Sequence, residues 1–288
     1  MVKIAVASGK GGVGKSMLAS SLAILFSQEK NIVALDTDVD APNLHLWLGE
    51  EENWDKVEKL STNQRPVIDQ EECTDCGKCV DVCQFGALSM EGGRLKVNSY
   101  FCEGCGACAI VCSDAIRMNS VDNAEIRIKE RTDYDFPLIS AQLKPGETGS
   151  GKIVDEIKLR AEQLESDLVL MDVPAGTGCP VISALKDVDF AVLITEPTLS
   201  GLSDLRRVLE IVDHFHITFG VVINKWDINQ SLSKQIEKEF GEQLLGKISY
   251  EKGIFQSIAD LTPVMESDLP AVGEIEKIFA QLKDVSSI

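Results

Sequence analysis

A glycine-rich loop between an apolar run and a helical stripe constrains the fold most. The run 2–7 leads into a string that fits G-x-x-x-x-G-K-[ST] at every fixed position, Gly9-Lys10-Gly11-Gly12-Val13-Gly14-Lys15-Ser16. Glycines let backbone N–H groups surround phosphate oxygens, and a helix that begins near Lys15 adds the positive end of its dipole. Lys15 is expected to reach the β- and γ-phosphates, and the Ser16 hydroxyl is expected to ligate Mg²⁺. A chance glycine-rich turn is the alternative, but the flanking strand and helix patterns argue against it.

The rest of the chain alternates between apolar runs and amphipathic stripes, with one interruption. Apolar runs at 31–35, 137–143, 168–171, 190–194 and 219–223 predict strands, and Ile153, Ile157, Ala161 and Leu164 predict a helix. Between 62 and 131 the pattern changes to short strands, turns and cysteine runs. Neither flanking part could bury a parallel sheet alone. We therefore expect a doubly wound parallel α/β domain, 1–61 and 132–288, with a small α+β module inserted at 62–131.

The inserted segment holds eight of the nine cysteines. They form two copies of C-x-x-C-x-x-C-x-x-x-C, which is a metal-binding pattern rather than a disulfide framework. Zinc is the competing metal, but four-cysteine zinc sites usually pair two C-x-x-C units and need no third cysteine in each run. The spacing therefore favours iron–sulfur clusters.

The charge balance excludes several classes of partner. Asp plus Glu number 46 and Lys plus Arg 28, so the formal charge is 28 − 46 = −18. A nucleic-acid backbone or an anionic membrane would repel such a chain. No signal peptide pattern and no apolar stretch of about 20 residues is visible, so a cytoplasmic location is expected.

The string that begins at Lys10 resembles the deviant phosphate-binding loop of the MinD, Mrp and nitrogenase iron protein superfamily. In that family the first lysine crosses a dimer interface, so the resemblance implies a role for Lys10 in a two-subunit sandwich. It also implies that Asp38, after the second strand, positions the attacking water. Asp172 would hold Mg²⁺ through water, and the Gly176 amide would sense the γ-phosphate. As structural alternatives, either aspartate could cap a helix and Lys10 could be a solvated loop lysine.

The nucleotide base is less sharply specified. The string Asn224-Lys225-Trp226-Asp227 matches the guanine-reading N-K-x-D pattern, whereas in the MinD-like family the asparagine contacts adenine. The resemblance favours ATP. A second glycine-rich string at 146–152 places Ile153 where a Ser or Thr should ligate Mg²⁺, so we interpret it as a turn and helix start.

The paired cysteine runs resemble those of bacterial two-cluster ferredoxins, in which the fourth cysteine of each run serves the other cluster. The resemblance implies one [4Fe–4S] cluster on Cys73, Cys76, Cys79 and Cys112. It implies a second cluster on Cys83, Cys102, Cys105 and Cys108. Gln84 and Ser113 stand where ferredoxins have proline. Two clusters close together would provide a path for single electrons. The alternative is a structural role, in which the clusters hold the inserted segment folded.

Several other residues are given structural roles. The string Asp172-Val173-Pro174-Ala175-Gly176 resembles the switch II of the MinD-like family. Cys179, just after it, is predicted to be a buried thiol, with cluster ligation as the alternative. Three histidines, His45, His214 and His216, are expected at the surface. The stripe Ile275, Ile278, Phe279 and Leu282 is expected to pack against the domain rather than bind a membrane.

The leading functional hypothesis is an ATPase whose nucleotide cycle is coupled to electron transfer through two clusters, with a protein donor and acceptor. The alternative is an ATP-regulated carrier or scaffold of clusters, like Mrp-type proteins, with an apo-protein client. The dimer would pair identical chains or a related ATPase. A positioning switch of the MinD or ParA kind needs a membrane or DNA surface, which the charge disfavours.

Overall fold

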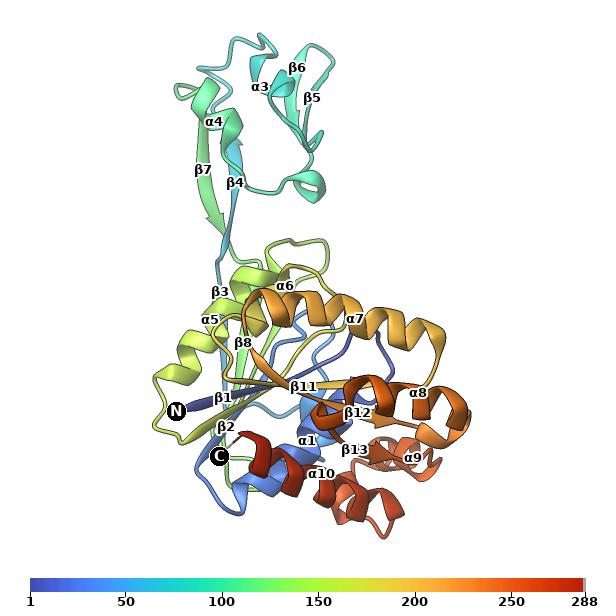
Figure 1. Ribbon diagram of the computed structural model, residues 1–288. Coiled ribbons are helices and arrows are strands. Elements are labelled where there is room, and N and C mark those ends of the chain that lie inside the picture. The colour runs from blue at the N-terminus through green and yellow to red at the C-terminus, as the bar shows by residue number, and fades with distance from the viewer. Residues whose placement is uncertain (287–288) are drawn as a thin grey trace.

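The computed structural model describes residues 1–286, and it separates a large α/β body from a small lobe (Figure 1). The body is built on a nine-stranded sheet with the strand order β13-β12-β11-β1-β10-β2-β9-β8-β3. Strands β13 to β9 in this order are parallel, whereas β8 and β3 are antiparallel additions at one edge. The strands are β1 (Val2–Ala7), β2 (Ile32–Asp36), β3 (Lys56–Leu60), β8 (Ala124–Lys129), β9 (Leu138–Leu143), β10 (Leu168–Asp172), β11 (Phe190–Thr195), β12 (Thr218–Asn224) and β13 (Leu244–Ile248).

Helices cover both faces of the sheet (Figure 1). One face carries α5 (Ser150–Glu162), α6 (Cys179–Leu185), α7 (Leu199–His214) and α8 (Gln230–Phe240). The other carries α1 (Lys15–Ser27), α2 (Leu44–Trp47), α9 (Gly253–Ala259) and α10 (Pro270–Ser286). Short 3₁₀ turns lie at Ser99–Phe101, Trp226–Asn229, Gly241–Gln243 and Val264–Glu266. The expected doubly wound architecture is confirmed.

Strand β1 shows why the apolar runs fold this way. Its side chains alternate between faces, so Ile4 and Val6 pack toward α1 and α10 while Ala5 and Ala7 pack toward the α5–α8 face. Both sets are fully buried. A strand that is covered on two sides reads as continuously apolar rather than alternating.

The apolar stripes of α1 and α10 are also buried. Leu18, Leu22 and Phe26 on α1 are inaccessible to solvent, and Phe26 meets Phe279 of α10 edge-on at 4.8 Å between ring centroids. The α10 stripe therefore packs on the body, as expected. No helix among residues 1–286 is long and apolar enough to cross a membrane.

The lobe consists of two two-stranded antiparallel sheets and two short α-helices that project from the β3–β8 edge (Figure 1). Its elements are β4 (Asn63–Ile68) paired with β7 (Ile116–Val121), β5 (Leu88–Glu91) paired with β6 (Arg94–Val97), α3 (Lys78–Asp81) and α4 (Ala107–Val111). A small core joins them, formed by Cys79, Leu88, Leu95, Cys108 and Ile116. Cysteine side chains thus supply part of the interior of the lobe.

The expected limit of the inserted segment at residue 131 needs correction. Strand β8 belongs to the large sheet, where it pairs with β3 and β9, and its Ala124 and Ile126 are fully buried beside α5. The projecting lobe therefore spans 63–121. Strand β8 alternates apolar and charged residues and lacks a continuous apolar run, so the sequence did not distinguish it from the lobe strands before it.

Candidate functional site

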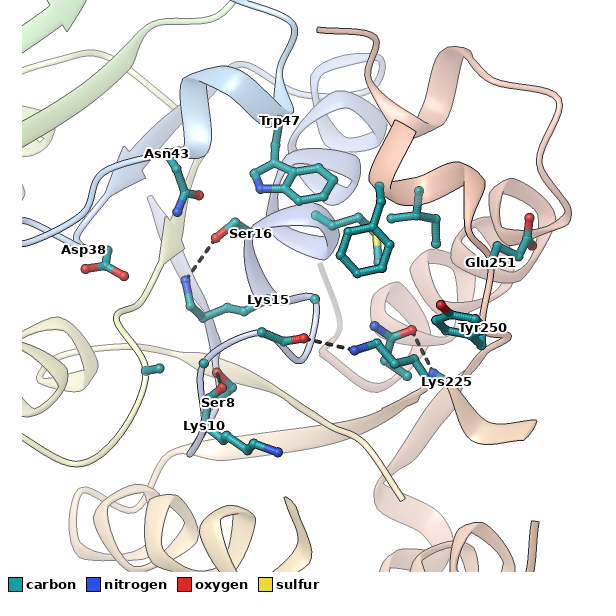
Figure 2. A pocket seen from close by; sticks show the side chains of 18 of the residues that line it. Ser8, Lys10, Lys15, Ser16, Asp38, Asn43, Trp47, Lys225, Tyr250 and Glu251 are labelled. Atoms are coloured by element: carbon teal, nitrogen blue, oxygen red, sulfur yellow. Dashed lines mark hydrogen bonds between the residues drawn. The ribbon is translucent and has the colours of Figure 1, made fainter. Parts of the chain in front are cut away.

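A pocket of about 370 Å³ lies at the carboxyl ends of the parallel strands (Figure 2). Ligands bind at this edge of open α/β sheets because the loops there diverge. The glycine loop forms its floor, and loops after four other strands form its walls. Those walls include Asp38, Asn43 and Trp47 after β2, Ala175 after β10, Asn224 and Lys225 after β12, and Ser249, Tyr250, Glu251, Ile254 and Phe255 after β13.

Two glycines of the loop are required by geometry. Gly14 has φ +96°, and a Cβ there would lie 2.3 Å from the Asn224 Nδ2 atom. A Cβ on Gly9 would lie 2.1 Å from the carbonyl oxygen of Asp204 on α7. The loop is therefore pressed between β12 and α7, and larger residues at these positions would displace it.

Lys15 and Asp172 form a buried ion pair under the loop. The Lys15 Nζ lies 2.5 Å from Asp172 Oδ1 and 3.3 Å from the Ser16 hydroxyl, and both ends of the ion pair are almost inaccessible to solvent. The second carboxylate oxygen, Asp172 Oδ2, is buried and has no hydrogen-bond partner among residues 1–286. A carboxylate oxygen and a hydroxyl oxygen are the donors that Mg²⁺ prefers, so the residues present fit a magnesium ion.

Two further aspartates follow β2. Asp36 is fully buried, and its carboxylate accepts hydrogen bonds from the backbone N–H groups of Asp38, Asn43 and Leu44. Burial, with the nearby Asp172 carboxylate, raises the pKa of Asp36 to about 7. Burial also raises the pKa of Asp38, which lines the pocket. Asp36 braces the turn that brings Asp38 to the pocket.

The side chain of Lys10 points out of the phosphate loop and is held by Glu196. Its Nζ lies 2.8 Å from Glu196 Oε1, and Figure 2 shows the side chain directed away from Lys15. Lys225 reaches the same carboxylate at 3.4 Å and the Gly12 carbonyl oxygen at 3.1 Å. The Lys10 side chain remains 40% exposed, so it is accessible from outside this subunit.

Gly176 lies at the opposite edge of the loop. It has φ +99°, and its N–H donates to the Ser8 carbonyl oxygen at 3.0 Å. The expected switch II residue therefore joins the glycine loop directly through the main chain.

Sequence analysis missed the wall formed by Trp47, Tyr250 and Phe255. Tyr250 and Phe255 follow β13, a short strand that the apolar pattern did not reveal. Asn224 lines the pocket, but its amide donates to the Val13 carbonyl oxygen at 2.7 Å and its Oδ1 accepts from Lys225 N. Its polar groups brace the glycine loop.

The eight lobe cysteines fall into two groups of four, each around a separate cavity. One cavity, of about 220 Å³, is lined by Cys73, Cys76, Cys79 and Cys112. The other, of about 20 Å³, is lined by Cys83, Cys102, Cys105 and Cys108. These are the two sets that the ferredoxin resemblance implies, with the fourth cysteine of each run contributed to the other group.

Local structure brings each group together. Gly77 and Gly106 have φ near +76°, and each turns the chain into the short helix that carries the third cysteine of its run. The backbone N–H of Lys78 lowers the pKa of Cys76, whereas burial raises the pKa values of Cys79 and Cys108.

The spacing of the thiols bears on the kind of group that they could hold. Within residues 1–286, no three His, Cys, Asp or Glu side chains are grouped so that they could hold a single metal ion. Four thiols are the donor set that a four-iron cluster takes. The residues present therefore fit a cluster in chemistry and number.

Two other predictions, those for Cys179 and His45, are contradicted by the structure. Cys179 is exposed at the start of α6, so the prediction of a buried thiol is wrong. His45 is buried beside Trp54, with ring centroids 5.3 Å apart, and burial lowers its pKa. His45 lies on the short helix α2 and packs on Trp54 from the loop before β3, a contact that local spacing could not indicate. His214 and His216 are exposed, as expected.

The second glycine-rich string behaves as predicted. A turn lies at 145–146 and α5 begins at Ser150. Lys152 lies outside the nucleotide pocket, with its Nζ 3.4 Å from the Thr62 carbonyl oxygen.

Comparison with known proteins decides the family, because the model of the CobQ/CobB/MinD/ParA nucleotide-binding domain matches residues 4–264. The chain belongs to this family. An uncharacterized protein of Methanocaldococcus jannaschii is 39% identical over 99% of this chain and 97% of its own length. An iron–sulfur cluster carrier protein of Pyrococcus horikoshii is 23% identical over 98% and 87%. The structure of MinD with Mg-ADP from Pyrococcus horikoshii is 16% identical, covers 99% and 97%, and gives a TM-score of 0.63, which shows the shared fold.

Proposed function

We propose that the chain is an ATP-dependent iron–sulfur redox protein. The observation that carries the proposal is the grouping of eight thiols into two sets of four on one lobe. This lobe projects from the β3–β8 edge of a nucleotide-binding fold, and in chain order it lies between β2 and β10. Those two strands end at Asp36 and Asp172, beside the phosphate loop. The lobe, residues 63–121, is proposed to be a two-cluster domain of the ferredoxin kind.

Nucleotide binding would rearrange the buried ion pair. A triphosphate competes with Asp172 for the Lys15 ammonium, since both are anions in a site with little water. Ser16 would then ligate Mg²⁺ directly and Asp172 would hold it through water, while Asp38 would orient the attacking water. Mg²⁺ would neutralise phosphate charge. Most of the catalysis comes from positioning and charge neutralisation.

The position of Lys10 suggests that it acts on nucleotide bound to a second subunit. Its ammonium is accessible and is held by Glu196 rather than by its own phosphate loop. Release from Glu196 would allow it to reach phosphates bound to a partner subunit. The proposed active form is therefore a dimer closed around nucleotide, of identical chains or with a related ATPase.

The base is proposed to be adenine. Guanine recognition by an N-K-x-D string needs the aspartate carboxylate in the pocket, but Asp227 does not line it. Its Oδ1 accepts a hydrogen bond from the backbone N–H of Tyr250 at 2.8 Å. The similarity to MinD with bound Mg-ADP points the same way.

The two groups of thiols would each hold a [4Fe–4S] cluster, which accepts and passes on single electrons when bound. The chain's own part is to supply thiolates at fixed separation and to limit contact with water. Cys79, Cys102 and Cys108 are buried, whereas Cys76 and Cys105 are exposed. Each group thus has one edge open to a protein donor or acceptor.

Those exposed ligands also support a second candidate, a carrier that delivers clusters to an apo-protein. An accessible thiol ligand can exchange with a thiol of a client. The similarity to the iron–sulfur cluster carrier of Pyrococcus horikoshii favours the same function. Clusters that move to an apo-ferredoxin on addition of MgATP would select this candidate over electron transfer.

Iron and labile sulfide counts on anaerobically purified protein test the clusters. We expect about eight of each per chain. Cys83→Ser and Cys112→Ser should each lower the iron count, and each should perturb the cluster whose other three ligands come from the opposite run. Cys179→Ser, which changes an exposed thiol outside both groups, is the control and should leave the count unchanged. Zinc without sulfide would overturn the proposal.

A further inference from the structure

The loop between β9 and α5, residues 144–149, joins the lobe to the body. Arg65 of β4 donates from Nη2 to Glu147 Oε2 at 2.8 Å, and both side chains are mostly buried. Asn63, the first residue of β4, donates from Nδ2 to the Thr148 hydroxyl at 2.9 Å. Two polar contacts thus hold the base of the lobe to a single loop.

The body holds the same loop from its other side. The Asn123 amide donates to the Thr148 carbonyl oxygen at 2.9 Å, and Lys144 N donates to the Asn123 carbonyl oxygen at 2.9 Å. From the lobe, the ring of Tyr100 also lies so close to Gly146 that a Cβ there would be 2.8 Å from it. The loop is therefore fixed between two parts of the molecule.

On the lobe side, the contacts lead to a cysteine group. Gly104, between Cys102 and Cys105, lies against Asn63, and a Cβ on this glycine would be 2.1 Å from Asn63 Oδ1. One side chain, Asn63, therefore touches both the Cys102–Cys105 segment and the loop at Thr148.

On the body side, the contacts lead to the nucleotide site. Helix α5 begins directly after the loop, and its Gly151 packs against the backbone of Cys179, the first residue of α6. Ser183 of α6 donates to the Gly151 carbonyl oxygen at 2.9 Å, and Lys158 of α5 donates to the Ser183 carbonyl oxygen at 2.9 Å. Helix α6 follows Asp172 and Gly176, so its position is tied to theirs.

We propose that the 144–149 loop and α5 couple the nucleotide state to the cysteine lobe, with Asn63 and Glu147 as positioning residues. This inference rests on the proposed function. Contact is continuous from Gly104 through Asn63 and Thr148 to α5, and from α5 through α6 to the strand end that holds Asp172. Nucleotide that moves this end shifts the loop under the lobe. Coupling free energy is reciprocal, so the redox state of the lobe changes nucleotide affinity by the same factor.

The test measures nucleotide affinity in two redox states. Full-length, anaerobically purified protein is titrated with Mg-ADP after oxidation and after reduction. We expect the two dissociation constants to differ by about fivefold or more. Glu147→Gln and Asn63→Ala should bring their ratio toward one while leaving the oxidised-state value within about twofold of the wild type. Exchanging the pair, Arg65→Glu with Glu147→Arg, should restore the ratio.

Glu52→Gln is the matched control, because Glu52 accepts from Arg127 Nη1 at 2.9 Å on the body, away from this loop. It should keep the wild-type ratio. A wild-type ratio of one, or a ratio unchanged in both loop variants, would overturn the coupling. If Glu147→Gln does not fold, Thr148→Ala replaces it.

A second readout separates this inference from the proposed function. Hydrogen exchange at 63–68 and 144–149 is followed as Mg-ADP is added, which needs no cluster. If the protein lacks iron and sulfide, the cluster proposal is refuted. A nucleotide-dependent change in exchange that Glu147→Gln abolishes would still support coupling through α5 and the 144–149 loop. Exchange that is the same with and without nucleotide argues against the route itself.

Discussion

Single buried carboxylates determine how the phosphate pocket responds to pH. Asp36 and Asp172 lie close together behind the glycine loop, and only Asp172 contacts the Lys15 ammonium directly. Asp36 instead depends on three backbone N–H groups. The two aspartates therefore have different roles, although both end adjacent strands.

Asp36 is expected to make stability depend on pH. Its pKa is about 7 in the folded protein and near 3.8 unfolded, so between these values the folded state binds more protons. Stability from this group is therefore lost as pH rises from about 4 to about 7. Asp36→Asn cannot titrate, so the free energy of unfolding should fall less across this window. Urea unfolding at pH 5 and pH 7.5, without Mg²⁺ or nucleotide, measures the free energy of unfolding of both proteins. An equal fall in this free energy between the two pH values in both proteins would contradict the assignment.

Asn224 is expected to act as a brace of the glycine loop. Asn224→Ala leaves the Val13 carbonyl oxygen without its buried donor, which should cost about 1–3 kcal/mol of stability and weaken nucleotide binding. Asn224→Asp keeps the size but cannot donate, so it should be at least as harmful. Asn53→Ala, at an exposed position, is the control. Calorimetric titration with Mg-ADP and chemical unfolding measure both effects.

At the scale of elements, the contact between the glycine loop and α7 sets the shape of the site. The loop leaves β1 and meets the Asp204 backbone at Gly9. A Cβ on Gly11, by contrast, would have no atom of residues 1–286 within 4 Å apart from its chain neighbours. The same glycine-rich string therefore contains sterically closed positions, such as Gly9, and an open one, Gly11.

These two glycines provide a matched pair. Gly9→Ala should lower the free energy of unfolding by about 1–3 kcal/mol, because the new methyl group would overlap the α7 backbone. Gly11→Ala should change stability by less than about 0.5 kcal/mol. Guanidinium unfolding of the two variants distinguishes them. Equal losses would mean that flexibility of the loop, rather than its fit against α7, requires glycine.

At the scale of the whole molecule, the lobe and the body have separate cores. The lobe core contains cysteine side chains and residues of 63–121, whereas the body buries both faces of a nine-stranded sheet. The chain leaves the body after Leu60 and returns at Ala124, and these two residues are paired across β3 and β8. Strands β3 and β8 are therefore paired right up to the point where the chain enters and leaves the lobe.

The body should fold without the lobe. Replacement of 63–121 by a short Gly-Ser linker leaves the paired residues Leu60 and Ala124 in place, so the sheet keeps all its strands. We expect cooperative unfolding, Mg-ADP affinity within about tenfold of the full chain, and no bound iron. Circular dichroism, calorimetric titration and iron analysis test this, and an insoluble or unfolded product would show that the two parts depend on each other.

The sequence alone determined the features that are encoded in adjacent residues. The glycine loop, the strands that surround it and the duplicated cysteine runs are local patterns, because phosphate cradles and thiolate sets need fixed spacing along the chain. Those patterns were enough to predict the family and the doubly wound sheet.

Only the tertiary structure decided which distant segments meet. It placed β8 in the large sheet, exposed Cys179, buried His45 and brought the loop after β13 to the nucleotide pocket. It also set residues 144–149 against the base of the lobe. These outcomes depend on packing between residues far apart in the chain, and short-range spacing carries no information about such contacts.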